Sequence, residues 1–129
     1  MAEARRVLVV EDEDAVGQVV ADVLADEGYD VRRARNGREG LELLREWRPQ
    51  LILLDLMMPE MDGRSFRARQ RQLGGSIAAV PVIVLSAAHE ARARVGELEA
   101  VEAISKPFDL DEVVAAVGRW ALPGRPGPE

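Results

Sequence analysis

The stretch that decides the fold is Leu51–Gly63, which reads LILLDLMMPEMDG. Four aliphatic residues, Leu51 to Leu54, have the composition of a buried strand, and they lead directly into Asp55. A carboxylate at the end of a buried strand loses its hydration, and this is costly unless other groups compensate the charge. The rest of the chain must therefore supply groups that compensate Asp55.

The composition is that of one globular domain. The chain has 129 residues, of which 47% are apolar and 31% charged. It has no cysteine, which excludes disulfides, thiol chemistry and zinc–thiolate sites. We find no signal peptide and no apolar run of the roughly 20 residues that a membrane helix needs, so we expect a cytoplasmic protein without a membrane partner. The net charge of −6 argues against direct binding to nucleic acid.

Almost all basic residues are arginines: Lys106 is the only lysine among seventeen lysines and arginines. Either this is chance, or Lys106 marks a site that needs a compact, flexible point charge. Four arginines form a local basic cluster, which we interpret as the solvated face of a helix, with a docking surface as the alternative. Its members are Arg64, Arg67, Arg69 and Arg71.

Apolar periodicity predicts five strands that alternate with five helices. The strands are expected at Arg5–Val10, Tyr29–Ala34, Leu51–Leu54, Val80–Leu85 and Val101–Ser105. The first helix has an apolar face of Val16, Val19, Val20, Val23 and Leu24, and the second follows a turn at Asn36-Gly37 and stops at Pro49. The remaining helices are expected at Met61–Leu73, closed by Gly74-Gly75, at Ala88–Val95, and after a capping box of Asp109 and Glu112.

Strands that are apolar on both faces and alternate with helices indicate a parallel sheet with helices on both sides. We therefore predict an α/β fold: a doubly wound five-stranded parallel sheet with five helices in (βα)5 order. One domain is expected over residues 1–122. The Pro/Gly tail at 123–129 is expected to be disordered, with no output domain after it.

Polar residues follow the predicted strands at their carboxyl ends. Glu11 and Asp12 follow the first, Asp55 the third, Ser86 the fourth and Lys106 the fifth. The carboxyl ends of parallel strands share one edge, where sites form, so these residues should converge. Three carboxylates repel one another and need cations. Lys106 supplies one charge, and Mg²⁺, which binds few carboxylates and keeps several waters, suits the rest.

Each of these residues also has an ordinary structural explanation when it is taken alone. Glu11 or Asp12 could favour the start of a helix, and Ser86 could be a helix cap. Asp55 could be a turn residue ahead of Pro59, and a lone lysine is usually at the surface. Their joint placement at strand ends that share an edge favours a site.

The set of motifs resembles the receiver domain of two-component response regulators, which are CheY-like proteins of flavodoxin-like fold. The resemblance extends from about Arg5 to Leu122. The matching residues are Glu11-Asp12 after VLVV, Asp55 within LLDLMMPEMDG, Ser86-Ala87 after VIVL, and Lys106-Pro107-Phe108.

The resemblance implies that Asp55 accepts a phosphoryl group from the phosphohistidine of a sensor histidine kinase or phosphotransfer protein. It implies Mg²⁺ as cofactor, with Glu11, Asp12, Asp55 and the backbone carbonyl of Met57 as the metal site. Such a chain is a phosphoacceptor that assists its own phosphorylation and dephosphorylation, and it is not classed as an enzyme.

The same resemblance implies that Lys106 pairs with the phosphoryl oxygens and that Ser86 is the switch hydroxyl. The bond before Pro107 is implied to be cis. A downstream protein would bind the region from Ala87 to Trp120, through which a homodimer could also form.

Two departures from the family pattern bear on signalling. Ala103 stands where the family usually has an aromatic switch residue, three positions before Lys106, so signalling must use backbone or helix movement. Glu99 replaces a family glycine, and a short or irregular fourth helix is expected.

Two other functions remain as alternatives. One is a receiver-like docking module that is never phosphorylated, which Ala103 leaves open. The other is a Mg²⁺-dependent aspartyl phosphatase. Asp55-Leu56-Met57 disfavours the phosphatase, because those enzymes carry a second acid at the third position.

Overall fold

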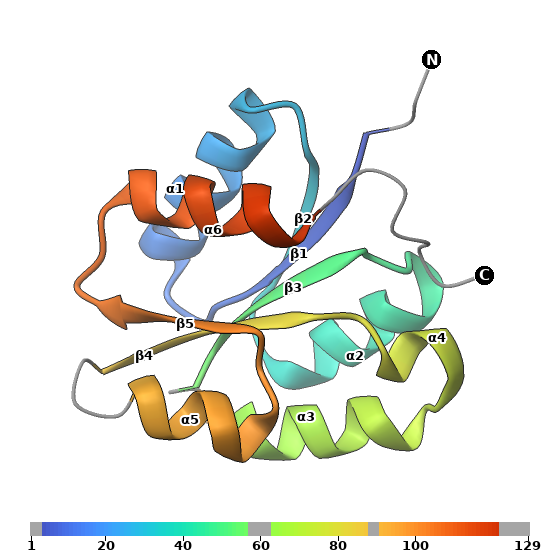
Figure 1. Ribbon diagram of the computed structural model, residues 1–129. Helices are drawn as coiled ribbons and strands as arrows, with labels where there is room; N and C mark the ends of the chain where they lie inside the picture. Colours follow the sequence, from blue (N-terminus) through green and yellow to red (C-terminus); the bar gives the residue numbers. More distant parts are fainter. Residues whose placement is uncertain (1–3, 57–62, 88–90, 122–129) are drawn as a thin grey trace.

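The fold is a single parallel β-sheet covered by helices on both faces (Figure 1). The computed structural model describes residues 4–56, 63–87 and 91–121. The strands are β1 (Arg6–Val10), β2 (Asp30–Ala34), β3 (Leu51–Asp55), β4 (Val82–Ala87) and β5 (Glu102–Lys106). They pair in the order β2-β1-β3-β4-β5, which is the order of flavodoxin-like folds. The predicted fold class is therefore confirmed.

The helices form two layers. They are α1 (Asp14–Asp26), α2 (Gly37–Glu46), α3 (Gly63–Gln72), α4 (Gly75–Ala78), α5 (Ala91–Leu98) and α6 (Leu110–Trp120). In Figure 1, α1 and α6 lie on one face of the sheet, and α2 to α5 lie on the other. None of the helices in the described ranges is long and apolar enough to cross a membrane.

Alternation along the central strands builds a core on each face of the sheet. In β1, Val7 and Val9 pack with α1 and α6, whereas Leu8 and Val10 pack with α2, α3 and α5. All four side chains have no exposed surface. A strand buried on both faces needs apolar residues at every position, which is why β1 and β3 read as continuous aliphatic runs.

Two local predictions on the α2–α5 face were wrong. Asn36-Gly37 is a helix start and not a turn, because the Asn36 side chain accepts a hydrogen bond of 2.9 Å from the Glu39 N–H and caps α2. The described ranges hold six helices where five were predicted. The extra helix, α4, begins at Gly75 directly after Gly74, and both glycines have the positive φ that closes one helix and opens the next.

Arg67 on α3 corrects the prediction that the arginine cluster is a solvated face. Its side chain is buried, with 9% of the residue exposed. It donates to the carbonyls of Leu98 and Glu99 at 2.9 and 3.2 Å, and to the Gln70 side chain at 2.8 Å. Gln70 in turn donates to the Val80 carbonyl. The guanidinium thus satisfies carbonyls at the end of α5, which otherwise have no helical partner.

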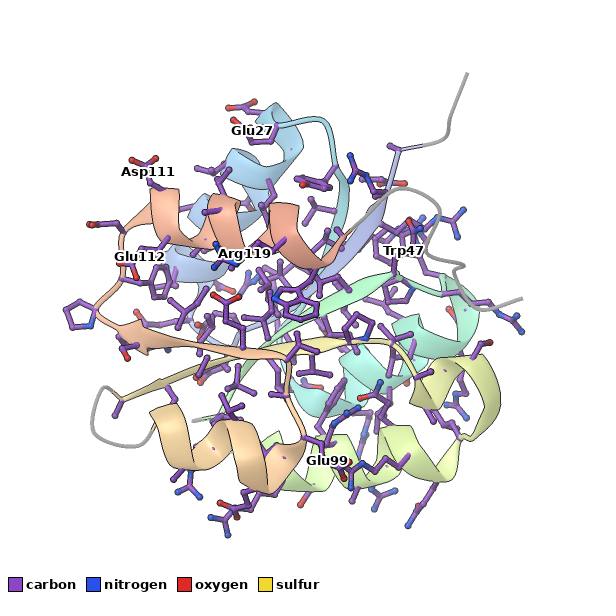
Figure 2. The ribbon with its side chains drawn as sticks, viewed as in Figure 1. Glu27, Trp47, Glu99, Asp111, Glu112 and Arg119 are labelled. Carbon is purple, nitrogen blue, oxygen red and sulfur yellow. The ribbon has the colours of Figure 1, made fainter. Side chains whose placement is uncertain are left out.

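Glu99, which stands where the family usually has a glycine, is the residue directly after α5. Glu99 follows α5 with a φ of 53°, a conformation that glycine adopts at least cost. Figure 2 shows Glu99 on the side of the sheet that carries α3, and its carboxylate forms an ion pair with Arg71. The described part of α5, Ala91–Leu98, is eight residues long, and the helix start predicted at Ala88 falls on residues that the structure does not describe. Residues 88–90 lie outside the described ranges.

We predict that Arg67→Met destabilises the protein by about 2–4 kcal/mol, because it leaves the buried side-chain oxygen of Gln70 without its donor and the Leu98 carbonyl with only the 3.3 Å hydrogen bond from Arg71. Urea unfolding of the variant measures this loss. Arg69→Met, which removes an exposed arginine from the same helix, is the matched control and should change the free energy of unfolding by no more than about 0.5 kcal/mol. Equal losses in the two variants would contradict a structural role for Arg67.

Candidate functional site

The register of the sheet brings the predicted site residues to one edge. Glu11 directly follows β1, and Asp55 is the last residue of β3, the strand beside it. Lys106 is the last residue of β5 and pairs with Ala87 of β4, one position beyond Ser86. The sheet order changes direction between β1 and β3, which is the place where parallel α/β sheets form sites.

Lys106 contacts both buried acids. Its Nζ lies 3.2 Å from Oδ1 of Asp55 and 3.3 Å from Oε1 of Glu11. Each acid is only 1% exposed, whereas the lysine side chain is 30% exposed and approaches them from the surface. This ammonium is the compensating group that the sequence required for Asp55.

Burial and charge change the proton affinity of both partners. Burial, together with a hydrogen bond that protonated Glu11 donates to Asp55 and the negative charge of Asp55, raises the pKa of Glu11 to about 7. Burial by itself would lower the pKa of Lys106, but the charges of Asp55 and Glu11 outweigh it and hold that pKa above its usual value. The lysine is therefore fully charged at neutral pH, and Glu11 is poised between its two forms.

The three acids fit a divalent cation. Glu11, Asp12 and Asp55 each offer a carboxylate oxygen, and these oxygens all lie within 4.8 Å of one another. Asp12 is exposed, so one side of the cluster is open to water. A few hard oxygen ligands with room for water molecules suit Mg²⁺ better than a dehydrated cage would. The backbone carbonyl of Met57, the fourth predicted ligand, lies outside the described residues.

Ser86 and Ala103 lie on the two strands at the far side of the site. Ser86 is buried, and its hydroxyl donates to the Ala87 carbonyl at 3.4 Å. Ala103 pairs with Val84 and packs against the core on the α2–α5 face. The peptide bond between Lys106 and Pro107 is cis, as the resemblance implied.

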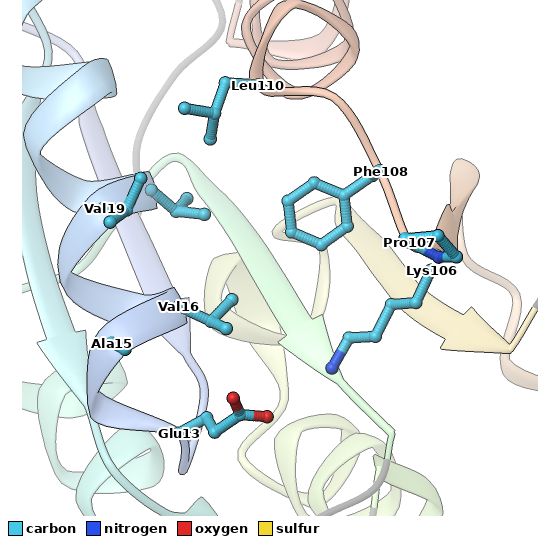
Figure 3. Close-up of a pocket in the computed structure, with 9 residues that line it drawn as sticks. Glu13, Ala15, Val16, Val19, Lys106, Pro107, Phe108 and Leu110 are labelled. Atoms are coloured by element: carbon cyan, nitrogen blue, oxygen red, sulfur yellow. The ribbon is translucent and has the colours of Figure 1, made fainter.

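An apolar cavity of about 440 Å³ opens beside Lys106 and was not predicted from the sequence (Figure 3). It lies between α1 and the segment that joins β5 to α6. Val16 and Val19 of α1 line one side, and Phe108 and Leu110 the other. Val19 belongs to the apolar face predicted for the first helix, and it is 46% exposed. Its spacing along α1 therefore does not bury it, and its side chain lines the cavity.

Both the sequence and the fold of this chain match known proteins. The family model for the response regulator receiver domain matches residues 7–118. The transcriptional regulatory protein DltR of Streptococcus agalactiae (strain NEM316) is 38% identical over 114 residues, which are 87% of this chain and 50% of DltR. The chain therefore spans about half the length of this relative.

Solved structures show the same architecture. The receiver domain of the Francisella response regulator 1452 has a TM-score of 0.81 and 28% identity, with 91% of this chain and 96% of that one covered. The response regulator protein TrrA of Thermotoga maritima, solved in complex with Mg²⁺-BeF, has a TM-score of 0.78 and 28% identity over 92% of this chain and 99% of TrrA.

We predict that Glu11 makes the metal-free protein less stable as the pH rises from 4.5 to 7. In this window the folded state keeps a proton that the unfolded state has lost, so the free energy of unfolding falls, by up to about 3 kcal/mol. Glu11→Gln cannot lose this proton, so its stability relative to the unmodified protein should increase through the window. Urea titrations at several pH values measure the difference.

Added Mg²⁺ is the control for this pH dependence, since a cation favours the ionised carboxylate and competes with the proton. It should recover the stability lost near pH 7 in the unmodified protein. A constant difference between the two proteins across the window would show that Glu11 titrates at its ordinary pKa.

Proposed function

Because this chain belongs to the response regulator receiver domain family, we propose that it is a phosphoacceptor of two-component signalling and that Asp55 is the residue modified. The single observation that supports this assignment best is the contact of Lys106 with Asp55 and Glu11 at the sheet edge. The donor would be the phosphohistidine of a histidine kinase or phosphotransfer protein.

In the proposed transfer, a carboxylate oxygen of Asp55 forms the new O–P bond while the N–P bond to the donor imidazole breaks. The imidazole nitrogen keeps the electron pair of that bond. The Lys106 ammonium, already 3.2 Å from Asp55, would stabilise the negative charge on the phosphoryl oxygens. Mg²⁺ held by Glu11, Asp12 and Asp55 would neutralise charge on the same oxygens, and the Met57 carbonyl is proposed as a further ligand.

The output is proposed to involve the region from Ala87 to Trp120, which contains α5, β5 and α6. Ser86 stands at the head of this region and is proposed as the hydroxyl that responds to the phosphoryl group. With Ala103 in β5, no aromatic side chain can change rotamer there, so we propose that α5 itself moves. Movement between two pre-existing arrangements is a population shift.

The partners follow from the same surfaces. The apolar cavity between Val19 and Phe108 lies beside Lys106, so a helix of the phosphodonor protein could bind there while its histidine reaches Asp55. A downstream protein, or a second copy of the chain, would bind the region from Ala87 to Trp120. Because the chain spans about half of DltR, the output of the whole protein is itself part of the proposal.

We predict that incubation with Mg²⁺ and a small phosphodonor such as phosphoramidate adds one phosphoryl group to the protein. Asp55→Asn should remove the modification, because an amide is not an anionic nucleophile. Intact-mass spectrometry measures the addition. Asp26→Asn, at the exposed end of α1, is the matched control and should be modified like the unmodified protein.

Two outcomes would contradict the proposal. If Asp55→Asn and the unmodified chain gained the same mass, another residue would be the acceptor. If neither gained mass with any donor or kinase, the docking module would replace the phosphoacceptor as the best assignment.

A further inference from the structure

Arg33, in β2, reaches across α1 to the loop that carries two of the three acids. Its Nη2 donates to the main-chain carbonyl of Glu11 at 2.8 Å. Its Nη1 lies 2.8 Å from the carboxylate of Asp14, the first residue of α1. The side chain is only 12% exposed, and neither the fold class nor the proposed phosphoryl transfer accounts for it.

Gly17 is what allows Arg33 to take this path. A Cβ atom built on Gly17 would lie 2.1 Å from Nε and 2.8 Å from Cζ of the guanidinium, so any larger residue must displace it. Gly17 is inside α1, where glycine is unfavourable by roughly 1 kcal/mol relative to alanine.

The burial of the Arg33 guanidinium is also unfavourable in one respect. Within the described residues, Arg33 Nε is the one buried side-chain nitrogen or oxygen that has no hydrogen-bond partner. A buried donor without a partner is unfavourable, so the contacts of the two terminal nitrogens must outweigh it. Those contacts join β2 to both ends of the segment from Glu11 to Asp14.

We infer that Arg33, passing through the notch at Gly17, is a positioning residue that fixes the segment of residues 11–14 so that Glu11 and Asp12 face Asp55. The inference rests on the proposed function, in which these acids bind Mg²⁺. Arg33 binds a main-chain oxygen and leaves the carboxylates free for the cation. Groups that orient metal ligands in this way typically change metal affinity by 10–100-fold when they are removed.

The sign of the effect separates positioning from simple electrostatics. Arg33 is a cation near a cation site, so its charge alone opposes Mg²⁺ binding. If charge were its only influence, Arg33→Met would bind Mg²⁺ more tightly. If Arg33 positions the acids, the variant binds Mg²⁺ more weakly, by roughly tenfold.

The test is a double-mutant cycle in which calorimetry measures the Mg²⁺ dissociation constant. We expect Arg33→Met and Gly17→Ala each to weaken binding by roughly tenfold. The double variant should be no weaker than Arg33→Met, because the new methyl group has no guanidinium left to displace. Arg35→Met is the matched control, since Arg35 also pairs with Asp14 but has no contact with the Glu11 carbonyl. It should bind Mg²⁺ as tightly as the unmodified protein or slightly more so.

Amide hydrogen exchange of the metal-free proteins is the second measurement, and it does not depend on Mg²⁺. The amides of residues 11–14 should exchange faster in Arg33→Met and in Gly17→Ala, while the amides of β3 stay protected and report that both variants are folded. Unchanged exchange at residues 11–14 would overturn the inference. So would Mg²⁺ affinity in Arg33→Met that equals or exceeds that of the unmodified protein, or losses that add in the double variant.

Failure of the unmodified chain to bind Mg²⁺ is a different result, because it would contradict the proposed function. The positioning of residues 11–14 would then be decided by the exchange measurement alone.

Discussion

The burial of Glu11 and Asp55 side by side is the constraint on which the rest of the site depends. Two carboxylates with 1% exposure each cannot both be ionised without a neighbouring cation. With Asp12 included, three carboxylates and the Lys106 ammonium would carry a formal charge of −2. A proton on Glu11 relieves part of this charge, and a divalent cation would relieve all of it. A proton and a divalent cation would therefore compete for the same oxygens, and the exposed Asp12 leaves one side of the cluster open to water.

The choice of basic residues follows the same physics. Arg67, which is buried, and Arg33, whose side chain is 12% exposed, both donate to main-chain carbonyls at points where a strand or helix has ended. A planar fork with several donors can satisfy two such oxygens at once. At the sheet edge the requirement is different, because Lys106 must place one compact charge between two carboxylates. This explains why one lysine remains in a chain that otherwise uses arginine.

The arginine on α3 also bears on how a signal could leave the site. α3 begins at Gly63, soon after Asp55, and Arg67 joins this helix to the end of α5. Ala103 offers no side chain large enough to act as a switch on β5. If α5 moves, either α3 moves with it or the Arg67 hydrogen bonds break. The position of α3 therefore restricts the movement of the proposed output region.

The sequence by itself determined the fold class, the sheet edge and the residues that meet there. It could do so because aliphatic runs, helical periods and strand ends are local patterns, and a parallel sheet places all carboxyl ends together. The helix start at Asn36, the extra turn of α4 and the exposure of Val19 could not be predicted, since each depends on which neighbour occupies the adjacent space. The same holds for Arg33 and Arg67. Arginine is normally a surface residue, and nothing near either one in the chain indicates burial. Only the tertiary structure brings Gly17 beside Arg33 and the end of α5 beside Arg67, because these pairs belong to different elements and their contact is decided by packing.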